Sequence, residues 1–185
     1  MRIEERKGGF RLSANKIVYI TLGLLFVIVA ILAYLNRGDA ELRDALKENR
    51  EFQIRVDGVP KANVDLKKLI ELTPQEFKTT FSTSLSGPRE TTLKGVELRI
   101  LLSDLEIDFS NAGRILVSGL DSYYSPLSRE EVEKEETVYI CFSMDGEILK
   151  SQSEGGYGPY LLVIRGAQFA QRWCKYVEAV DIVGN

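Results

Sequence analysis

The longest apolar stretch of the chain covers residues 17–35, which contain no charge, no proline and only Thr21 as a clearly polar side chain. With a rise of about 1.5 Å per residue, a helix of this length spans about 28 Å, close to the roughly 30 Å hydrocarbon core of a bilayer. A long helix of a soluble protein keeps a polar stripe. The pattern therefore predicts a transmembrane helix over residues 17–35, with a buried helix of a soluble core as the alternative.

Charged residues around this stretch indicate its orientation. Residues 1–16 carry five Lys and Arg against two Glu, whereas the rest of the chain is acidic. Basic flanks stay in the cytoplasm, and the apolar run is longer than that of a cleaved secretory signal, so an uncleaved signal anchor is favoured. We expect a cytoplasmic basic tail over residues 1–16 and a single-pass protein of the cell membrane. Its C-terminal domain is expected to be extracytoplasmic, with the lipid bilayer as the partner of residues 17–35.

Beyond the anchor, the pattern changes to short segments of helical or strand period. Asp39 suits the start of a short helix, so residues 36–51 are expected to form a juxtamembrane stalk helix, with a dimer contact as the alternative role. Half-buried alternation begins at Phe52, and the domain is expected to cover residues 52–185. The expected strands are residues 52–56, 77–81, 114–117, 138–143, 161–164 and 176–183, and the expected helices are residues 66–72, 98–105 and 130–135.

Three short signals mark where elements begin or turn. Asp65 suits the N-cap of the helix over residues 66–72, and Ser128 with Glu131 forms a capping box. Asp145-Gly146 is typical of a two-residue hairpin turn. Strands and short helices alternate without a regular βαβ order, so we expect an α+β fold built on a mixed β-sheet with short helices.

Composition limits the chemistry that this domain can perform. The chain has no histidine, which removes the commonest general base at neutral pH and the commonest metal ligand. Cys141 and Cys174 each lie among apolar residues, so two separate buried thiols are favoured over a disulfide. Trp173 is expected in the core. No cluster of Lys and Arg follows the anchor and the net charge is −3, so nucleic acid is not an expected partner.

Four motifs follow one another between Phe52 and Val183. They are the G-V-x-L-x-x-L-L sequence of residues 95–102, the Asp121-Ser122-Tyr123 strand end, the Asp145-Gly146 hairpin, and the glycine-proline loop of residues 155–159 with its following strand and Trp173-x-Lys175. In this order they resemble the oxidoreductase molybdopterin-binding domain of the sulfite oxidase-like superfamily. The resemblance implies that fold and molybdopterin as the cofactor.

The sequence departs from that family at the metal site. Catalytic members have a molybdenum-ligating cysteine upstream of the G-V motif, whereas residues 77–93 contain none, and hydroxyls near Thr83 are poor soft ligands. The histidine that anchors the pterin in many members is absent, and Ser122 replaces a glycine. We therefore expect no catalytic and no metal-ligating residue.

Three functions remain open. A non-catalytic module that binds a small anionic ligand or a membrane-protein partner is favoured over a molybdopterin-dependent oxidoreductase with atypical metal coordination and over a structural assembly protein. Arginines suit an oxyanion, although an ion pair with an acidic residue is the alternative for each. Glycines admit a ligand close to the backbone or simply form tight turns. The residues expected at the cleft are Arg89, Asp121, Tyr123, Tyr124, Gly155, Gly156, Tyr157 and Arg165.

Overall fold

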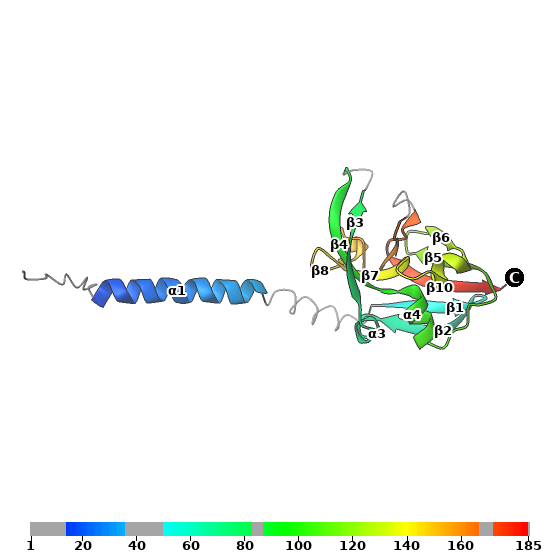
Figure 1. The fold of residues 1–185 in the computed structure, drawn as a ribbon, viewed down its shortest axis with the longest axis horizontal. Helices are drawn as coiled ribbons and strands as arrows, with labels where there is room; N and C mark the ends of the chain where they lie inside the picture. The colour runs from blue at the N-terminus through cyan, green and yellow to red at the C-terminus, as the bar shows by residue number, and fades with distance from the viewer. Residues whose placement is uncertain (1–13, 36–49, 83–86, 167–171, 185) are drawn as a thin grey trace, which may run out of the picture. The chain divides into compact units, whose positions relative to one another are not determined.

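The computed structural model describes residues 14–35, 50–82, 87–166 and 172–184. Its contacts divide the chain into two units, Met1–Asp39 and Ala40–Asn185. The first unit contains helix α1 (Ala14–Leu35), drawn in blue in Figure 1, and the second contains all the strands. The expected basic tail over residues 1–16 and the expected stalk helix over residues 36–51 lie, apart from their last residues, outside the described residues.

Helix α1 contains the whole apolar stretch. Its described apolar side chains are exposed, from 45% for Ile28 to 76% for Phe26. Counting only the part of the chain that the structure describes, no helix combines the length and the hydropathy needed to cross a membrane. The membrane anchor therefore stays a prediction from the sequence.

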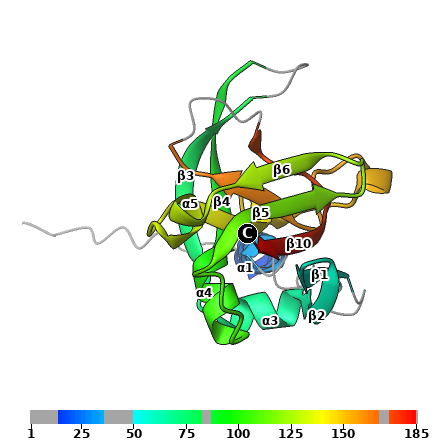
Figure 2. The ribbon, with the colours of Figure 1, turned by 90° about the vertical axis from the view of Figure 1, so that its right-hand side faces the viewer.

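One five-stranded sheet has the order β2-β1-β10-β5-β6. Its strands are β1 (Glu51–Val56), β2 (Val59–Asp65), β5 (Ala112–Gly119), β6 (Tyr124–Leu127) and β10 (Val177–Gly184). β1 and β10 run parallel, with Ile54 opposite Val180, while the other neighbours are antiparallel. The sheet is mixed, as predicted, and Figure 2 shows β5 and β6 side by side at one edge.

In the second five-stranded sheet, all paired strands run antiparallel. It has the order β3-β4-β7-β8, with β9 paired to β7. Its strands are β3 (Gln75–Phe81), β4 (Arg89–Glu97), β7 (Val138–Met144), β8 (Glu147–Ile148) and β9 (Leu161–Ile164). Every residue of β7 is buried, which confirms the predicted interior strand. The expected single mixed sheet is thus two sheets, of which one is mixed.

Short helices connect the strands. They are α3 (Leu66–Glu71), α4 (Leu98–Asp104), α5 (Arg129–Glu133) and the 3₁₀ turn η1 (Gln152–Glu154). The Asp65 carboxylate accepts a hydrogen bond from the Lys68 backbone N–H, and both bonds of the Ser128 capping box are present, so both predicted helix starts are confirmed. α5 ends before the expected Glu135, because Lys134 already has an extended backbone.

Residues of both sheets and of helices α3, α4 and α5 share one buried apolar cluster. Phe52 and Ile54 enter it from β1, which explains the alternation seen in the sequence. Trp173 belongs to this cluster, as predicted, and its indole N–H donates to the carbonyl oxygen of Ile164. Cys141 and Cys174 are both buried and free, which confirms the two separate thiols.

Candidate functional site

A groove opens between the turn that joins β7 to β8 and the glycine-proline loop. It has a volume of about 370 Å³, and we call it the hairpin groove. Its lining residues are Arg89, Met144, Asp145, Glu147, Ile148, Leu149, Lys150, Gly156 and Tyr157. Arg89, Gly156 and Tyr157, which lie far apart in the sequence, were all expected at the cleft. The structure brings these three together.

The β7–β8 turn forms one wall of the hairpin groove. Asp145 and Gly146 both have positive φ, of 54° and 85°, as a two-residue hairpin turn requires. The Asp145 carboxylate accepts hydrogen bonds from the Thr92 backbone N–H (2.8 Å) and the Thr91 hydroxyl (2.7 Å). These bonds, with the nearby Arg89 guanidinium, lower the pKa of Asp145 below its usual value. This wall therefore carries a negative charge at neutral pH.

Arg89 supplies the positive charge of the same wall. One of its terminal nitrogens lies 3.7 Å from the Asp145 carboxylate and donates to the Met144 sulfur at 3.6 Å. The ion pair that the sequence left as an alternative is therefore present. The Arg89 side chain is still 55% exposed. A guanidinium has five N–H donors, so these contacts leave donors available to a ligand in the groove.

The glycine-proline loop forms the opposite wall. A Cβ atom at Gly156 would overlap the Lys150 carbonyl, and one at Gly158 would lie 2.5 Å from the Leu149 Cβ. Gly155 has a φ of 76°. Gly155 is thus explained by its left-handed turn, and Gly156 and Gly158 by the close packing of the loop against Lys150 and Leu149.

The Tyr157 ring of this loop is held in place by contacts with its neighbours. Its ring meets the Phe81 ring edge to face, with 5.0 Å between centroids. The Lys175 ammonium lies 4.8 Å from the centre of the same ring. Phe81 in turn stacks on Trp173, whose side chain belongs to the core. The aromatic side of the hairpin groove is therefore supported from the interior.

Asp121, Tyr123 and Tyr124 lie at the turn from β5 to β6 and do not line the hairpin groove. The Asp121 carboxylate accepts a hydrogen bond from the Tyr123 backbone N–H at 3.2 Å, and Tyr124 is 61% exposed. Ser122, which replaces the glycine of the resembled family, has a φ of 63°. This left-handed conformation is the one that a glycine adopts without strain.

Arg165 lies elsewhere, just after β9. It forms an ion pair with Glu136 at 3.2 Å, and its guanidinium carbon lies 4.9 Å from the centre of the Phe77 ring. Arg165 lines a separate hollow of about 340 Å³, together with Lys134 and Arg172. The expected grouping of Arg89 with Arg165 at one cleft is therefore not found among the described residues.

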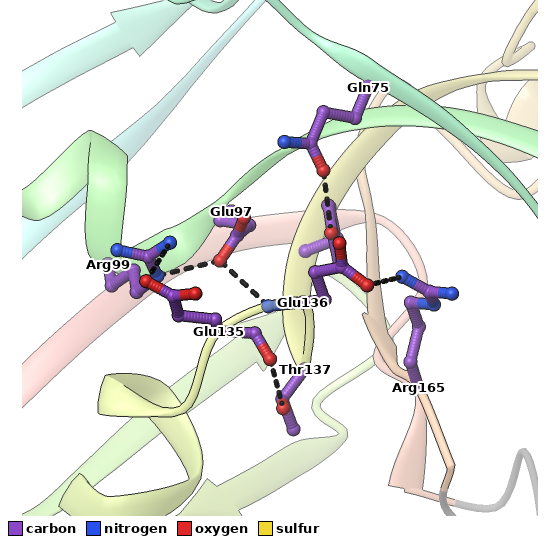
Figure 3. A network of polar contacts seen from close by, with 8 residues as sticks. Gln75, Glu97, Arg99, Glu135, Glu136, Thr137 and Arg165 are labelled. Atoms are coloured by element: carbon purple, nitrogen blue, oxygen red, sulfur yellow. Dashed lines mark hydrogen bonds and ion pairs between the residues drawn. The ribbon is translucent and has the colours of Figure 1, made fainter.

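A buried carboxylate that the sequence analysis missed organises the surroundings of Arg165. Glu97, with a side chain 3% exposed, accepts hydrogen bonds from the Arg99 guanidinium (2.7 Å) and the Glu136 backbone N–H (3.0 Å). Figure 3 shows this network from Arg99 through Glu97 to the loop that carries Glu136. Glu136 has a φ of 52° and pairs with Arg165. The only sequence signal was an acidic residue within the apolar G-V motif.

The described residues do not fit a molybdenum centre with a thiolate ligand. Cys141 and Cys174 are both buried in the apolar core, and neither lines the hairpin groove. Burial raises the pKa of both thiols, that of Cys174 to about 12. No group of three or more Cys, Asp or Glu able to hold a metal ion occurs within the described ranges. Thr83 lies outside them.

Comparisons with known proteins show similarity of fold. No known protein-family model matches the chain, and no curated protein matches its sequence. The crystal structure of the sulfane dehydrogenase SoxCD from Paracoccus pantotrophus is similar, with a TM-score of 0.60 and 18% sequence identity. The likeness covers 75% of this chain and 39% of that chain, so this chain spans less than half of its neighbour. The two structures share a distant sulfite oxidase-like fold.

Proposed function

We propose that this chain is a membrane-anchored, extracytoplasmic module of sulfite oxidase-like fold that binds a small anionic ligand without catalysing a reaction. The observation that carries the proposal is the hairpin groove, in which Arg89, Gly156 and Tyr157 meet. Arg89 offers a planar set of donors that matches a carboxylate or another oxyanion, and Tyr157 offers a flat apolar surface. A few convergent polar groups in a concave site are what a small-molecule site needs.

Binding is favoured over oxidoreductase chemistry because, among the described residues, the chain lacks suitable side chains to ligate molybdenum. A molybdenum ion bound by the family's usual route needs a thiolate that faces the cofactor site, whereas both cysteines are buried in the core and neither lines the hairpin groove. Histidine is absent from the whole chain. The groove carries a charged and an aromatic side chain, Arg89 and Tyr157, which suit the recognition of a small ligand.

The anchor is proposed from the sequence, in which residues 17–35 are apolar and uncharged over a length that matches the bilayer core. In the structure this stretch belongs to helix α1, whose described large apolar side chains are exposed. A lipid environment satisfies such a surface, since the helix makes its backbone hydrogen bonds internally. Protease added to intact spheroplasts is expected to remove the domain that follows. Full protection of the domain, with other outer-face proteins digested, would contradict this orientation.

The ligand is tested on the full chain, purified in detergent from its own membrane. Mass spectrometry of the compounds released by denaturation is expected to find one small anion with the parent protein. Arg89→Ala is expected to weaken binding about ten- to hundredfold, as the loss of one charge-assisted hydrogen bond implies.

Arg114→Ala is the matched control, since Arg114 is an exposed arginine on β5 of the other sheet. This variant is expected to retain the anion at the level of the parent. Equal retention by the Arg89 and Arg114 variants would show that the hairpin groove is not the binding site.

A further inference from the structure

Strand β3 is an edge of its sheet. It pairs with β4 along its whole length, and no other strand pairs with it among the described residues. The ladder of β4 with β7 begins only at Leu93, so β3 and β4 form a two-stranded ribbon beyond that point. Figures 1 and 2 show this ribbon rising away from β1 and β2. A two-stranded ribbon is marginally stable alone in water, and an open edge invites another strand.

The outward face of β3 carries charges of alternating sign. Glu76 and Lys78 point to this face, with side chains 62% and 71% exposed, while Phe77 and Phe81 are buried on the other face. Both charges already pair with β4, Glu76 with Lys94 at 3.5 Å and Lys78 with Glu90 at 2.9 Å. On this face, side chains of opposite charge therefore pair across β4 and β3, and the outermost of them, Glu76 and Lys78, lie on the edge strand.

We propose that β3 is the contact between two copies of this chain, which pair antiparallel, edge to edge, around a two-fold axis at Phe77. In such a pair, directly opposite residues lie on the same face of the sheet, so the axis must pass through a residue position. An axis at Phe77 places Glu76 of each copy opposite Lys78 of the other. Side chains of opposite charge are then paired across the contact as they are within each copy.

The other registers lack this complementarity. An axis at Glu76 places the two Glu76 carboxylates opposite each other, and an axis at Lys78 does the same for the two ammonium groups. An axis at Thr79 sets Lys78 opposite Thr80. Like charges directly opposite each other destabilise a strand pair. The sequence of β3 therefore selects one register for the pairing of two copies.

Two single charge reversals test this register in the full chain in detergent. With Glu76→Lys, positions 76 and 78 of the two copies place four positive charges at the contact. With Lys78→Glu, the same positions place four negative charges there. Each is expected to raise the dimer dissociation constant at least about tenfold. An equimolar mixture of the two variants restores unlike pairs, so it is expected to form a mixed dimer as tight as the parent. Size-exclusion chromatography with light scattering at about 100 µM suits the weak pairing of a small interface.

Disulfide cross-linking tests the register of the strand pair independently. Directly opposite residues in an antiparallel pair are close enough for a disulfide. Glu76→Cys mixed with Lys78→Cys is expected to give cross-linked dimers, whereas Lys78→Cys alone is expected to give few. A monomeric parent at about 100 µM would overturn the proposal. So would charge-reversed variants that dimerise like the parent, a mixture that stays monomeric, or cross-linking of Lys78→Cys with itself.

Discussion

Gly95 shows at the level of one residue why the G-V motif needs its glycine. It lies where β4 shifts register against β7. A Cβ atom there would lie 2.5 Å from the Ile140 carbonyl oxygen and 2.8 Å from the Cys141 sulfur. Real Cβ atoms do not approach other heavy atoms so closely. The glycine of this motif is therefore a packing requirement at the centre of the sheet.

Gly95→Ala is expected to destabilise the domain by about 1–3 kcal/mol, because the overlap with β7 forces the central strands apart. Urea unfolding of the full chain in detergent measures the change. Gly87→Ala is the matched control: nothing lies within 4 Å of a Cβ there, and the expected change is within about 0.5 kcal/mol. Equal stability of the Gly95 and Gly87 variants would show that β4 and β7 do not approach as described.

Among the elements, the β7–β8 turn is expected to make the stability of the domain depend on pH, through the Asp145 carboxylate. The Thr92 N–H, the Thr91 hydroxyl and Arg89 lower the pKa of Asp145 below its ordinary value of 3.8. A lowered folded-state pKa contributes stability that is complete above the unfolded value and is lost as pH falls through the folded value. The domain is expected to lose this contribution below about pH 4.

Asp145→Asn removes this titration, so its free energy of unfolding is expected to fall less steeply than that of the parent between about pH 6 and pH 3. Thr91→Val is expected to act in the same direction, because it removes a donor to the carboxylate. Thr92→Val is the control, since Thr92 donates through its backbone N–H, and it is expected to follow the parent. Identical slopes for all four proteins would show that Asp145 is not held as described.

Some strands and helices could be predicted from the sequence, and others could not. β1, β7 and the capped helices were predicted because apolar alternation, a run of apolar residues and capping side chains are local signals. β2 and β4 were not predicted: β2 contains Pro60, and β4 begins Arg89-Glu90-Thr91-Thr92. Pairing with neighbouring strands makes these polar segments extended, and such pairing depends on residues far away in the sequence.

At the scale of the whole domain, the sequence resemblance and the structural likeness both point to a sulfite oxidase-like fold. The candidate site was predicted only in part. Arg89, Gly156 and Tyr157 meet in the hairpin groove, whereas Arg165 lies by Glu136 and Asp121 lies at the β5–β6 turn. These positions follow from the order of strands in two sheets, which no local pattern encodes.

We propose that this fold binds a ligand without the metal chemistry of the family it resembles. Elemental analysis of the full chain, purified from a host with working molybdenum cofactor synthesis, distinguishes the two cases. No stoichiometric molybdenum is expected, because both cysteines are buried in the core, neither lines the hairpin groove, and the chain has no histidine. One molybdenum per chain would show that the fold retains the metal site.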